Sequence, residues 1–278
     1  MTRYNDLIFK YKKEFKDDTN LVRKYLFELC NEKEIDLYYH KDEEADKEIE
    51  QKFEKGIKRL LNNEPLNYVL GYSFFYGYKI KVNDKVLIPR FETEELVSHV
   101  LACYDSNFKG KKINVCDIGT GSGAIAIALK KEEDNMNLFA SDISREAIAV
   151  AKDNSKINKC KINYYIGNML EPLIKEDIHV DILISNPPYI KIDEEIESSV
   201  KDFEPHVALF GGDDGLKFYR EILSKANKVL KPNGFIFFEI GYDQKQPLSK
   251  CVKEVYPYAK VDVFKDINGK NRVMRISL

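Results

Sequence analysis

From about residue 90 to its end, the chain alternates short apolar runs with amphipathic segments of helical periodicity. The runs predicted to be strands are INVCDIG, NLFASDI, INYYIGN, VDILISN, FIFFEIG, AKVDVF and NRVMRISL. Helices between them are expected to begin near Gly121, Ser144 and Gly215 and again after Tyr242. Strands that alternate with helices form a largely parallel, helix-covered sheet, so this pattern predicts an α/β domain.

The last two predicted strands cannot both join that parallel arrangement. Only KDINGK separates them, and its Asn268-Gly269 pair favours a tight hairpin turn. One of the two strands must therefore run antiparallel. We expect a seven-stranded, mostly parallel sheet with a C-terminal antiparallel hairpin, which differs from a plain dinucleotide-binding fold.

The N-terminal part of the chain has a different pattern. It is rich in Lys, Glu and Asp, and apolar residues recur at helical spacing over 21–29 and 45–61. We therefore expect a small all-α domain over residues 1–72.

A β-hairpin is expected to link the two domains. Tyr78, Ile80 and Val82 alternate with polar residues, Asn83-Asp84 can turn the chain, and 86–88 alternate back. The predicted hairpin linker covers 73–89, and the α/β domain covers 90–278.

The overall charge gives no reason to expect nucleic-acid or membrane-surface binding. Lys plus Arg number 44 and Asp plus Glu 46, for a net charge of -2. The N-terminus is too charged for a signal peptide, and no apolar run approaches the ~18 residues of a membrane span. We expect a cytoplasmic protein with no membrane partner.

The cysteines and histidines indicate neither disulfides nor a metal. The five cysteines are odd in number and contain no CxxC pair, which suits a reducing compartment. The four histidines show no ligand spacing with one another or with the cysteines, so we predict no metal.

A glycine-rich loop follows the first strand of the α/β domain. In VCDIGTGSGAIAIAL, Gly119, Gly121 and Gly123 allow close backbone approach to a ligand at a helix start. With Ala124 the loop also fits the dinucleotide pattern, so alone it is a weak signal. A bare tight turn is a further alternative.

The next two strands end on residues suited to an adenosine. Asp142 lies about twenty residues beyond the loop, where a carboxylate can accept hydrogen bonds from both ribose hydroxyls. Asn168 and Met169 follow the third strand and could border the adenine. Capping of the next helix by Asp142 or Ser144, and core packing by Met169, remain open alternatives.

The fourth strand ends in SNPPYI, at the edge of the sheet where such folds bind ligands. The Asn186 side-chain oxygen and the Pro187 carbonyl can accept hydrogen bonds from the two N–H groups of a planar nitrogen. The prolines fix the backbone, and Tyr189 offers a flat face for stacking. A strand terminated by proline is the simpler alternative.

Such a site suits methylation of an amide or exocyclic base nitrogen by a sulfonium donor. The nitrogen lone pair is delocalised, so alignment matters more than a strong base. A carboxylate substrate would leave both acceptors unpaired, at about 1–3 kcal/mol each.

The chain resembles the class I S-adenosylmethionine-dependent methyltransferases, and within them the protein-(glutamine) methyltransferases that act on peptide chain release factors. The resemblance runs from about residue 20 to the end. It is carried by NEPLNYVLGYSFFYG, LIPRFETEELV, DIGTGSGAIAIAL, ISNPPYI, FEPHVALFGGDDGLKFYR and FEIGYDQ. The glycine loop is shared by many methyltransferases, whereas the ordered set is specific.

The resemblance implies an activity and its partners. S-adenosylmethionine would methylate the side-chain amide of the glutamine in a release factor's Gly-Gly-Gln motif, giving S-adenosylhomocysteine. The helical N-terminal domain would dock the release factor, the hairpin would link it to a seven-stranded catalytic domain, and the enzyme would act as a monomer.

The resemblance also implies roles for single residues. The loop Gly119, Thr120, Gly121, Ser122 and Gly123 would cradle the methionine part of the cofactor. Asp142 would hold the ribose, and Asn168 with Met169 the adenine. Asn186, Pro187, Pro188 and Tyr189 would form the substrate site, with Asn186 also facing the cofactor.

The family pattern leaves some positions open. Phe91 replaces a usual proline, and Asn168 stands where an acidic residue is common beside the adenine. Arg90 and Thr93 lie in the segment that closes over the cofactor, and the sequence assigns them no roles. Thr93 could equally cap the helix that follows it.

Other functions fit part of the pattern. An adenine amino-methyltransferase acting on DNA or RNA could use NPPY equally well, and a glutamine methyltransferase of a ribosomal protein shares nearly all the motifs. A nicotinamide-dependent dehydrogenase or a silent binding module would leave NPPY without a function.

Overall fold

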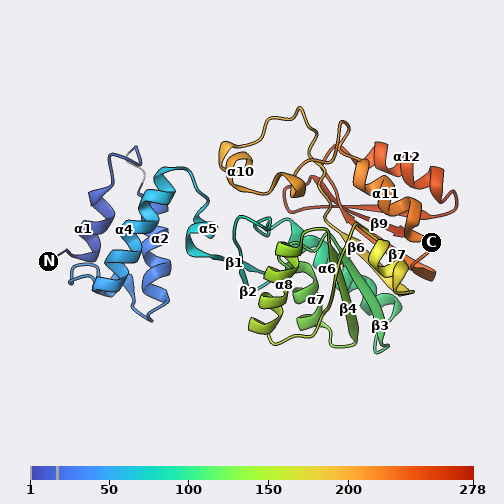
Figure 1. The fold of residues 1–278 in the computed structure, drawn as a ribbon, viewed down its shortest axis with the longest axis horizontal. Helices are drawn as coiled ribbons and strands as arrows, with labels where there is room; N and C mark the ends of the chain where they lie inside the picture. The colour runs from blue at the N-terminus through green and yellow to red at the C-terminus, as the bar shows by residue number, and fades with distance from the viewer. Residues whose placement is uncertain (1, 17–18) are drawn as a thin grey trace. The chain divides into compact units, whose positions relative to one another are not determined.

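Two units make up the part of the chain that the computed structural model describes, residues 2–16 and 19–278. The first comprises Met1–Tyr72 and Ile196–Phe203, and the second comprises Ser73–Glu195 and Glu204–Leu278. Each unit is drawn in Figure 1.

The first unit is helical. Its helices are α1 (Tyr4–Lys10), α2 (Asn20–Asn31), α3 (Leu37–His40), α4 (Lys47–Leu61), α5 (Leu66–Leu70) and α10 (Ser198–Phe203). The two predicted helical stretches become α2 and α4. Val22, Leu26, Phe53 and Ile57 are fully buried in its core, so the helical periodicity correctly predicted which faces pack together.

The short hairpin differs from the predicted one. It pairs β1 (Tyr72–Phe75) with β2 (Tyr78–Lys81). Its two-residue turn has φ of 51° at Tyr76 and 79° at Gly77. Positive φ at both central positions is typical of the tight turn whose twist matches a hairpin.

The predicted return strand over 86–88 is therefore wrong. Asn83 closes a local turn instead, since its side chain accepts from Lys85 N at 3.0 Å and its carbonyl from Val86 N at 3.2 Å. Val86 and Ile88 are buried as single apolar side chains of an irregular segment. The burial of every second residue, Val86 and Ile88, thus gives the sequence pattern of a strand, although this segment does not form one.

The second unit contains the predicted seven-stranded sheet, in the order β5-β4-β3-β6-β7-β9-β8. Its strands are β3 (Ile113–Ile118), β4 (Met136–Asp142), β5 (Asn163–Ile166), β6 (Val180–Ser185), β7 (Leu230–Glu239), β8 (Lys260–Lys265) and β9 (Asn271–Ser277). β3 to β7 pair in parallel, and β9 is antiparallel to both neighbours. The predicted C-terminal hairpin is therefore confirmed.

Helices cover both faces of this sheet (Figure 1). The helices of this unit are α6 (Thr93–Asn107), α7 (Ala124–Glu132), α8 (Arg145–Ile157), α9 (Glu171–Lys175), α11 (Lys217–Ala226) and α12 (Lys245–Val255), with a short 3₁₀ turn η1 (His206–Ala208). In the figure α6, α7 and α8 lie on one face and α11 and α12 on the other. Central strands such as β3 and β6 are consequently buried on both faces.

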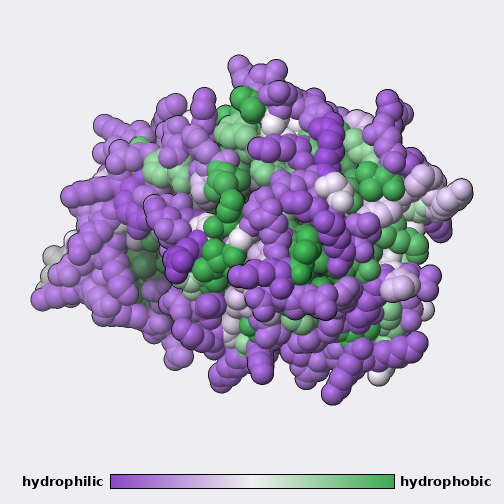
Figure 2. Space-filling model, turned by 45° about the vertical axis from the view of Figure 1, so that its right-hand side comes forward, coloured by the Kyte–Doolittle hydropathy of each residue, from purple (hydrophilic) through white to green (hydrophobic). Residues whose placement is uncertain are grey.

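The face of the molecule drawn in Figure 2 is mostly polar. Figure 2 shows hydrophilic residues over most of one face, with hydrophobic ones in small separate groups. Within residues 2–16 and 19–278, no helix is long and apolar enough to cross a membrane.

Candidate active site

A pocket of about 430 Å³ opens where several parallel strands of the second unit end. Its walls include residues directly after β3, at the end of β4, and shortly after β5 and β6. The chain order of the strands reverses between β3 and β6, because β4 and β5 lie on one side and β7 on the other. Open α/β sheets bind ligands at this switch point.

Many of the residues predicted from sequence line this pocket. They are Gly119, Gly121, Asp142, Asn168, Met169, Asn186 and Pro188. The predicted residues that do not line it are Thr120, Ser122, Gly123, Pro187 and Tyr189. The structure therefore brings the strand-end residues together around one pocket, whereas the second group does not line it.

The glycine loop forms a cradle with room for a ligand. Gly119 and Gly121 have φ of 71° and 53°, and a Cβ on either would meet no atom within 4 Å. Gly123 differs, because a Cβ there would lie 3.0 Å from the Tyr164 hydroxyl oxygen and 3.1 Å from Ala151 Cβ. Two glycines thus leave space for a ligand, and the third allows α7 to pack closely.

Asp142 shapes the loop and faces the pocket. Its Oδ2 accepts from Gly121 N and its Oδ1 from Ser144 N, both at 2.9 Å. Burial raises the pKa of this carboxyl, and the two backbone N–H groups partly offset that effect. Each carboxylate oxygen can accept a second hydrogen bond, so Asp142 can still receive a ligand hydroxyl. Ser144 caps α8 by accepting from Ala147 N.

Asp117, the carboxyl beneath the loop, is fully buried. Thr120 donates its hydroxyl proton to Asp117 Oδ2 at 2.6 Å, and Oδ1 has no hydrogen-bond partner among the described residues. Burial raises the pKa of Asp117 to about 7. Thr120 therefore supports the loop from below.

This raised pKa predicts a pH-dependent stability. An unfolded aspartate titrates near 3.9, so between about pH 4 and 7 the folded state binds more protons than the unfolded state. The free energy of unfolding should fall as pH rises through that window, by at most ~1.4 kcal/mol per pH unit, and then level off. We expect Asp117→Asn to flatten this slope in urea unfolding measured from pH 5 to 8. Parallel curves for the two proteins would contradict the assignment.

Asn186 is oriented by the start of α6. Its Nδ2 donates to Thr93 Oγ1 at 3.3 Å. Thr93 is 5% exposed and is the first residue of α6, whose N-cap position is Glu92, so Thr93 is not the capping residue of this helix. Burial raises the pKa of the Glu239 carboxyl, and the Thr93 side chain partly lowers it. With Nδ2 engaged, Oδ1 of Asn186 is the atom left to accept from a ligand.

Tyr189 contacts the protein core. Its hydroxyl donates to Glu239 Oε1 at 3.4 Å, and its ring packs against the buried cluster around β6 and β7. Its carbonyl accepts from Nε2 of the buried Gln244 at 3.2 Å. The NPPY segment is thus braced from behind.

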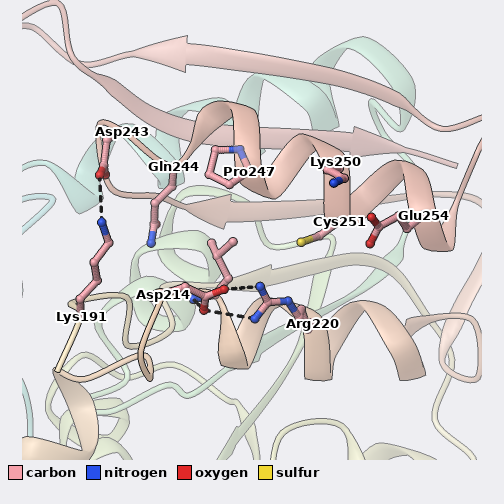
Figure 3. Close-up of a pocket in the computed structure, with 10 residues that line it drawn as sticks. Lys191, Asp214, Arg220, Asp243, Gln244, Pro247, Lys250, Cys251 and Glu254 are labelled. Atoms are coloured by element: carbon pink, nitrogen blue, oxygen red, sulfur yellow. Dashed lines mark hydrogen bonds and ion pairs between the residues drawn. The ribbon is translucent and has the colours of Figure 1, made fainter.

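Gln244 also lines a second hollow of about 400 Å³ (Figure 3). Lys191 lies 3.6 Å from Asp243, and Arg220 is bound through two hydrogen bonds to Asp214. Gln244 projects between these pairs in the figure. The Lys191–Asp243 pair links the segment after NPPY to the residues before α12.

The ion pair between Arg90 and Glu204 fixes another wall of the pocket. Arg90 Nη2 lies 2.5 Å from Glu204 Oε1, and the Glu204 side chain is 1% exposed. Pro205, Val207 and Ala208, which follow it, line the pocket. Arg90 thereby holds this segment against the site.

Removing one partner of the Arg90–Glu204 pair should lower the free energy of unfolding. Arg90→Met leaves a buried carboxylate unpaired, so we expect a loss of about 3 kcal/mol in unfolding free energy. The double variant Arg90→Met/Glu204→Gln should recover most of it, because no buried charge remains. Urea unfolding of the three proteins checks this, and equal destabilisation of both variants would contradict it.

The sequence did not identify several residues of the site. Lys217, Phe218 and Glu221 line the pocket from α11, and 85–87 line it from the segment after the hairpin. Most lie within or beside the motifs that carry the family resemblance. Their position next to these motifs is the one sequence signal that could have identified them. Their contacts with the pocket depend on tertiary structure, which local pattern does not show.

Among the described residues, no group of three or more His, Cys, Asp or Glu side chains is placed to hold a metal. The cysteines have no disulfide partner.

Two family models match the chain, the Methyltransferase small domain over residues 95–203 and the PrmC N-terminal domain over 16–71. A Bacillus cereus protein named release factor glutamine methyltransferase is 41% identical over 84% of this chain and 83% of its own length. A protein of the same name from Bacillus subtilis is 42% identical over 80% and 78%.

A solved structure supports the fold. A methyltransferase from Pyrococcus furiosus superposes with a TM-score of 0.52 at 18% identity, covering 80% of this chain and 98% of that one. The identity to the two Bacillus proteins shows more than the fold. By this identity, the chain belongs to the release factor glutamine methyltransferase family.

Proposed function

We propose that this chain transfers a methyl group from S-adenosylmethionine to the side-chain amide nitrogen of the glutamine in the Gly-Gly-Gln motif of peptide chain release factors. The observation that carries the proposal is the orientation of Asn186. Its amide donates to Thr93, so its oxygen is left to accept, in the pocket that also contains the glycine cradle. The names of the Bacillus relatives support the substrate.

The pocket residues suit this cofactor. The cradle at Gly119 and Gly121 would take the methionine part, Asp142 the ribose hydroxyls, and the Asn168-Met169 corner the adenine. Thr120, Ser122 and Gly123 would support the cradle from behind. When bound, S-adenosylmethionine supplies an electrophilic methyl, whose carbon–sulfur bond breaks with its electron pair on sulfur as the nitrogen–carbon bond forms, leaving S-adenosylhomocysteine.

The NPPY segment would hold the glutamine amide. The Oδ1 of Asn186 and the carbonyl of Pro187 would each accept one N–H, which aims the nitrogen at the methyl. Alignment of this kind can supply several of the ~7–11 kcal/mol available from proximity. The nitrogen loses its extra proton to water after transfer, so no strong base is needed. Pro188 and Tyr189 would keep the segment rigid beside the substrate.

The remaining parts of the proposal concern the whole enzyme. The helical domain over 1–72 would dock the release factor, 73–89 would link it to the catalytic domain over 90–278, and the enzyme would act as a monomer. Its substrate takes part in translation, so it would act in the cytoplasm. The near-neutral charge of the chain fits a protein substrate better than a nucleic acid.

The test is a methyl-transfer assay with labelled S-adenosylmethionine. The substrates are a release factor, the same factor with its Gly-Gly-Gln glutamine changed to glutamate, a ribosomal-protein extract, and DNA or RNA. We expect label on the unchanged factor only. Label on nucleic acid would establish an adenine methyltransferase, and label on the altered factor or on ribosomal protein would refute the proposed target.

A further inference from the structure

Asn168 and Glu221 meet at the adenine end of the pocket. Nδ2 of Asn168, just after β5, donates to Oε1 of Glu221 on α11, 53 residues further along the chain. Both side chains line the pocket. A carboxylate is therefore present at this corner, although it does not come from the strand end where the family pattern has one.

The chemistry of this contact fixes the orientation of the asparagine amide. A carboxylate can only accept hydrogen bonds, so the NH₂ group of Asn168 must face Glu221. The opposite orientation would place two oxygens together. Consequently Oδ1 of Asn168 is turned away from Glu221 and is available as an acceptor.

Glu221 is itself held in place. Lys225, one turn later on α11, lies 3.5 Å from Oε1 of Glu221 and 3.1 Å from Oε1 of Glu171. The Glu221 side chain is 23% exposed. Lys225 thus balances the negative charge and restricts the side chain, which keeps it directed at Asn168.

We propose that Glu221 is a positioning residue that holds Asn168 as a hydrogen-bond acceptor, so that the site selects an adenine amino group over a keto group. This inference rests on the proposed use of S-adenosylmethionine. The adenine amino group would donate to Oδ1, whereas the keto oxygen of hypoxanthine would face another acceptor. The cost of such a mismatch is about 1.4–2.8 kcal/mol, which corresponds to 10- to 100-fold in affinity.

The test compares two ligands that differ at this group, S-adenosylhomocysteine and S-inosylhomocysteine, by calorimetry on the full chain. We expect the wild type to prefer the adenosyl ligand by about 10- to 100-fold. Glu221→Leu should reduce that ratio to about threefold or less, because Asn168 can then rotate and donate to the keto oxygen. A general loss of structure would weaken both ligands alike and leave the ratio of their dissociation constants unchanged, whereas loss of the positioning role changes that ratio.

Two further variants complete the design. Glu171→Gln removes the other charged partner of Lys225 and leaves the hydrogen bond between the Asn168 and Glu221 side chains in place, so it should keep the wild-type ratio. Asn168→Asp/Glu221→Gln should restore the preference, since an aspartate can only accept. Melting temperatures confirm that each variant folds.

The outcomes distinguish this inference from the proposed function. If the wild type binds S-adenosylhomocysteine but does not discriminate, or if Glu221→Leu discriminates as well as the wild type, the role of Glu221 is refuted and the cofactor assignment stands. If the wild type binds neither ligand, the cofactor assignment fails and this inference fails with it.

Discussion

Replacing Asn186 with alanine is expected to lower kcat by about 100- to 1,000-fold, the loss typical of removing one preorganised polar group that acts on the reacting centre. Asn186 follows β6 directly, and its amide is oriented by Thr93. Without it, the glutamine amide loses one acceptor and its alignment with the methyl. The dissociation constant of S-adenosylhomocysteine should change by only a few-fold, because Asp142 and the glycine cradle remain.

Variants of Thr93 provide the control. Thr93→Val keeps the shape of the side chain but leaves Nδ2 of Asn186 without its acceptor, so we expect kcat to fall about tenfold as the amide loses its fixed orientation. Thr93→Ser keeps the hydroxyl and should retain most activity. Steady-state kinetics with a release factor, together with calorimetry for the cofactor product, measure both effects. If Asn186→Ala weakens cofactor binding as much as it weakens turnover, Asn186 chiefly holds the cofactor.

The sequence predicted the parts of the fold that local pattern determines. Central parallel strands such as β3 and β6 appeared as apolar runs because they are buried on both faces, and Asn268-Gly269 marked the turn between β8 and β9. The hairpin was misplaced because buried Val86 and Ile88 alternate as strand residues do. Only the two positive φ angles at Tyr76 and Gly77 identify the real turn, and a tyrosine at such a position gives no sequence signal.

The residues of the candidate site likewise divide into those that local pattern predicts and those that it does not. Gly119, Asp142, Asn168 and Asn186 lie at strand ends, so a correct strand order brings them together. Residues that act through long-range contacts were not predictable in this way. Thr93 meets Asn186 across 93 residues, Arg90 meets Glu204 across 114, and Glu221 meets Asn168 across 53. Side-chain partners of this kind depend on how helices and loops pack, which periodicity does not specify.

Gly211 is expected to be nearly as sensitive as Asn186, although it carries no side chain. A Cβ there would lie 2.5 Å from the Pro188 carbonyl oxygen and 2.8 Å from Tyr189 Cα. Both are backbone atoms of the NPPY segment, so the segment itself would have to move. We expect Gly211→Ala to cost about 1–3 kcal/mol in unfolding free energy. A shift of about 1 Å in the segment should lower kcat roughly 100-fold.

Gly269→Ala is the control that separates the steric clash expected at Gly211 from the backbone strain of an alanine at positive φ. Gly269 has a φ of 74° in the β8–β9 turn, and a Cβ there would meet no atom within 4 Å. Its replacement should cost about 1 kcal/mol through backbone strain and leave kcat unchanged, because nothing in the site is displaced. Urea unfolding and steady-state kinetics on both variants give the comparison. Full activity in Gly211→Ala would mean that NPPY tolerates displacement, and rigid placement of Asn186 and Pro187 would then not be the source of catalysis.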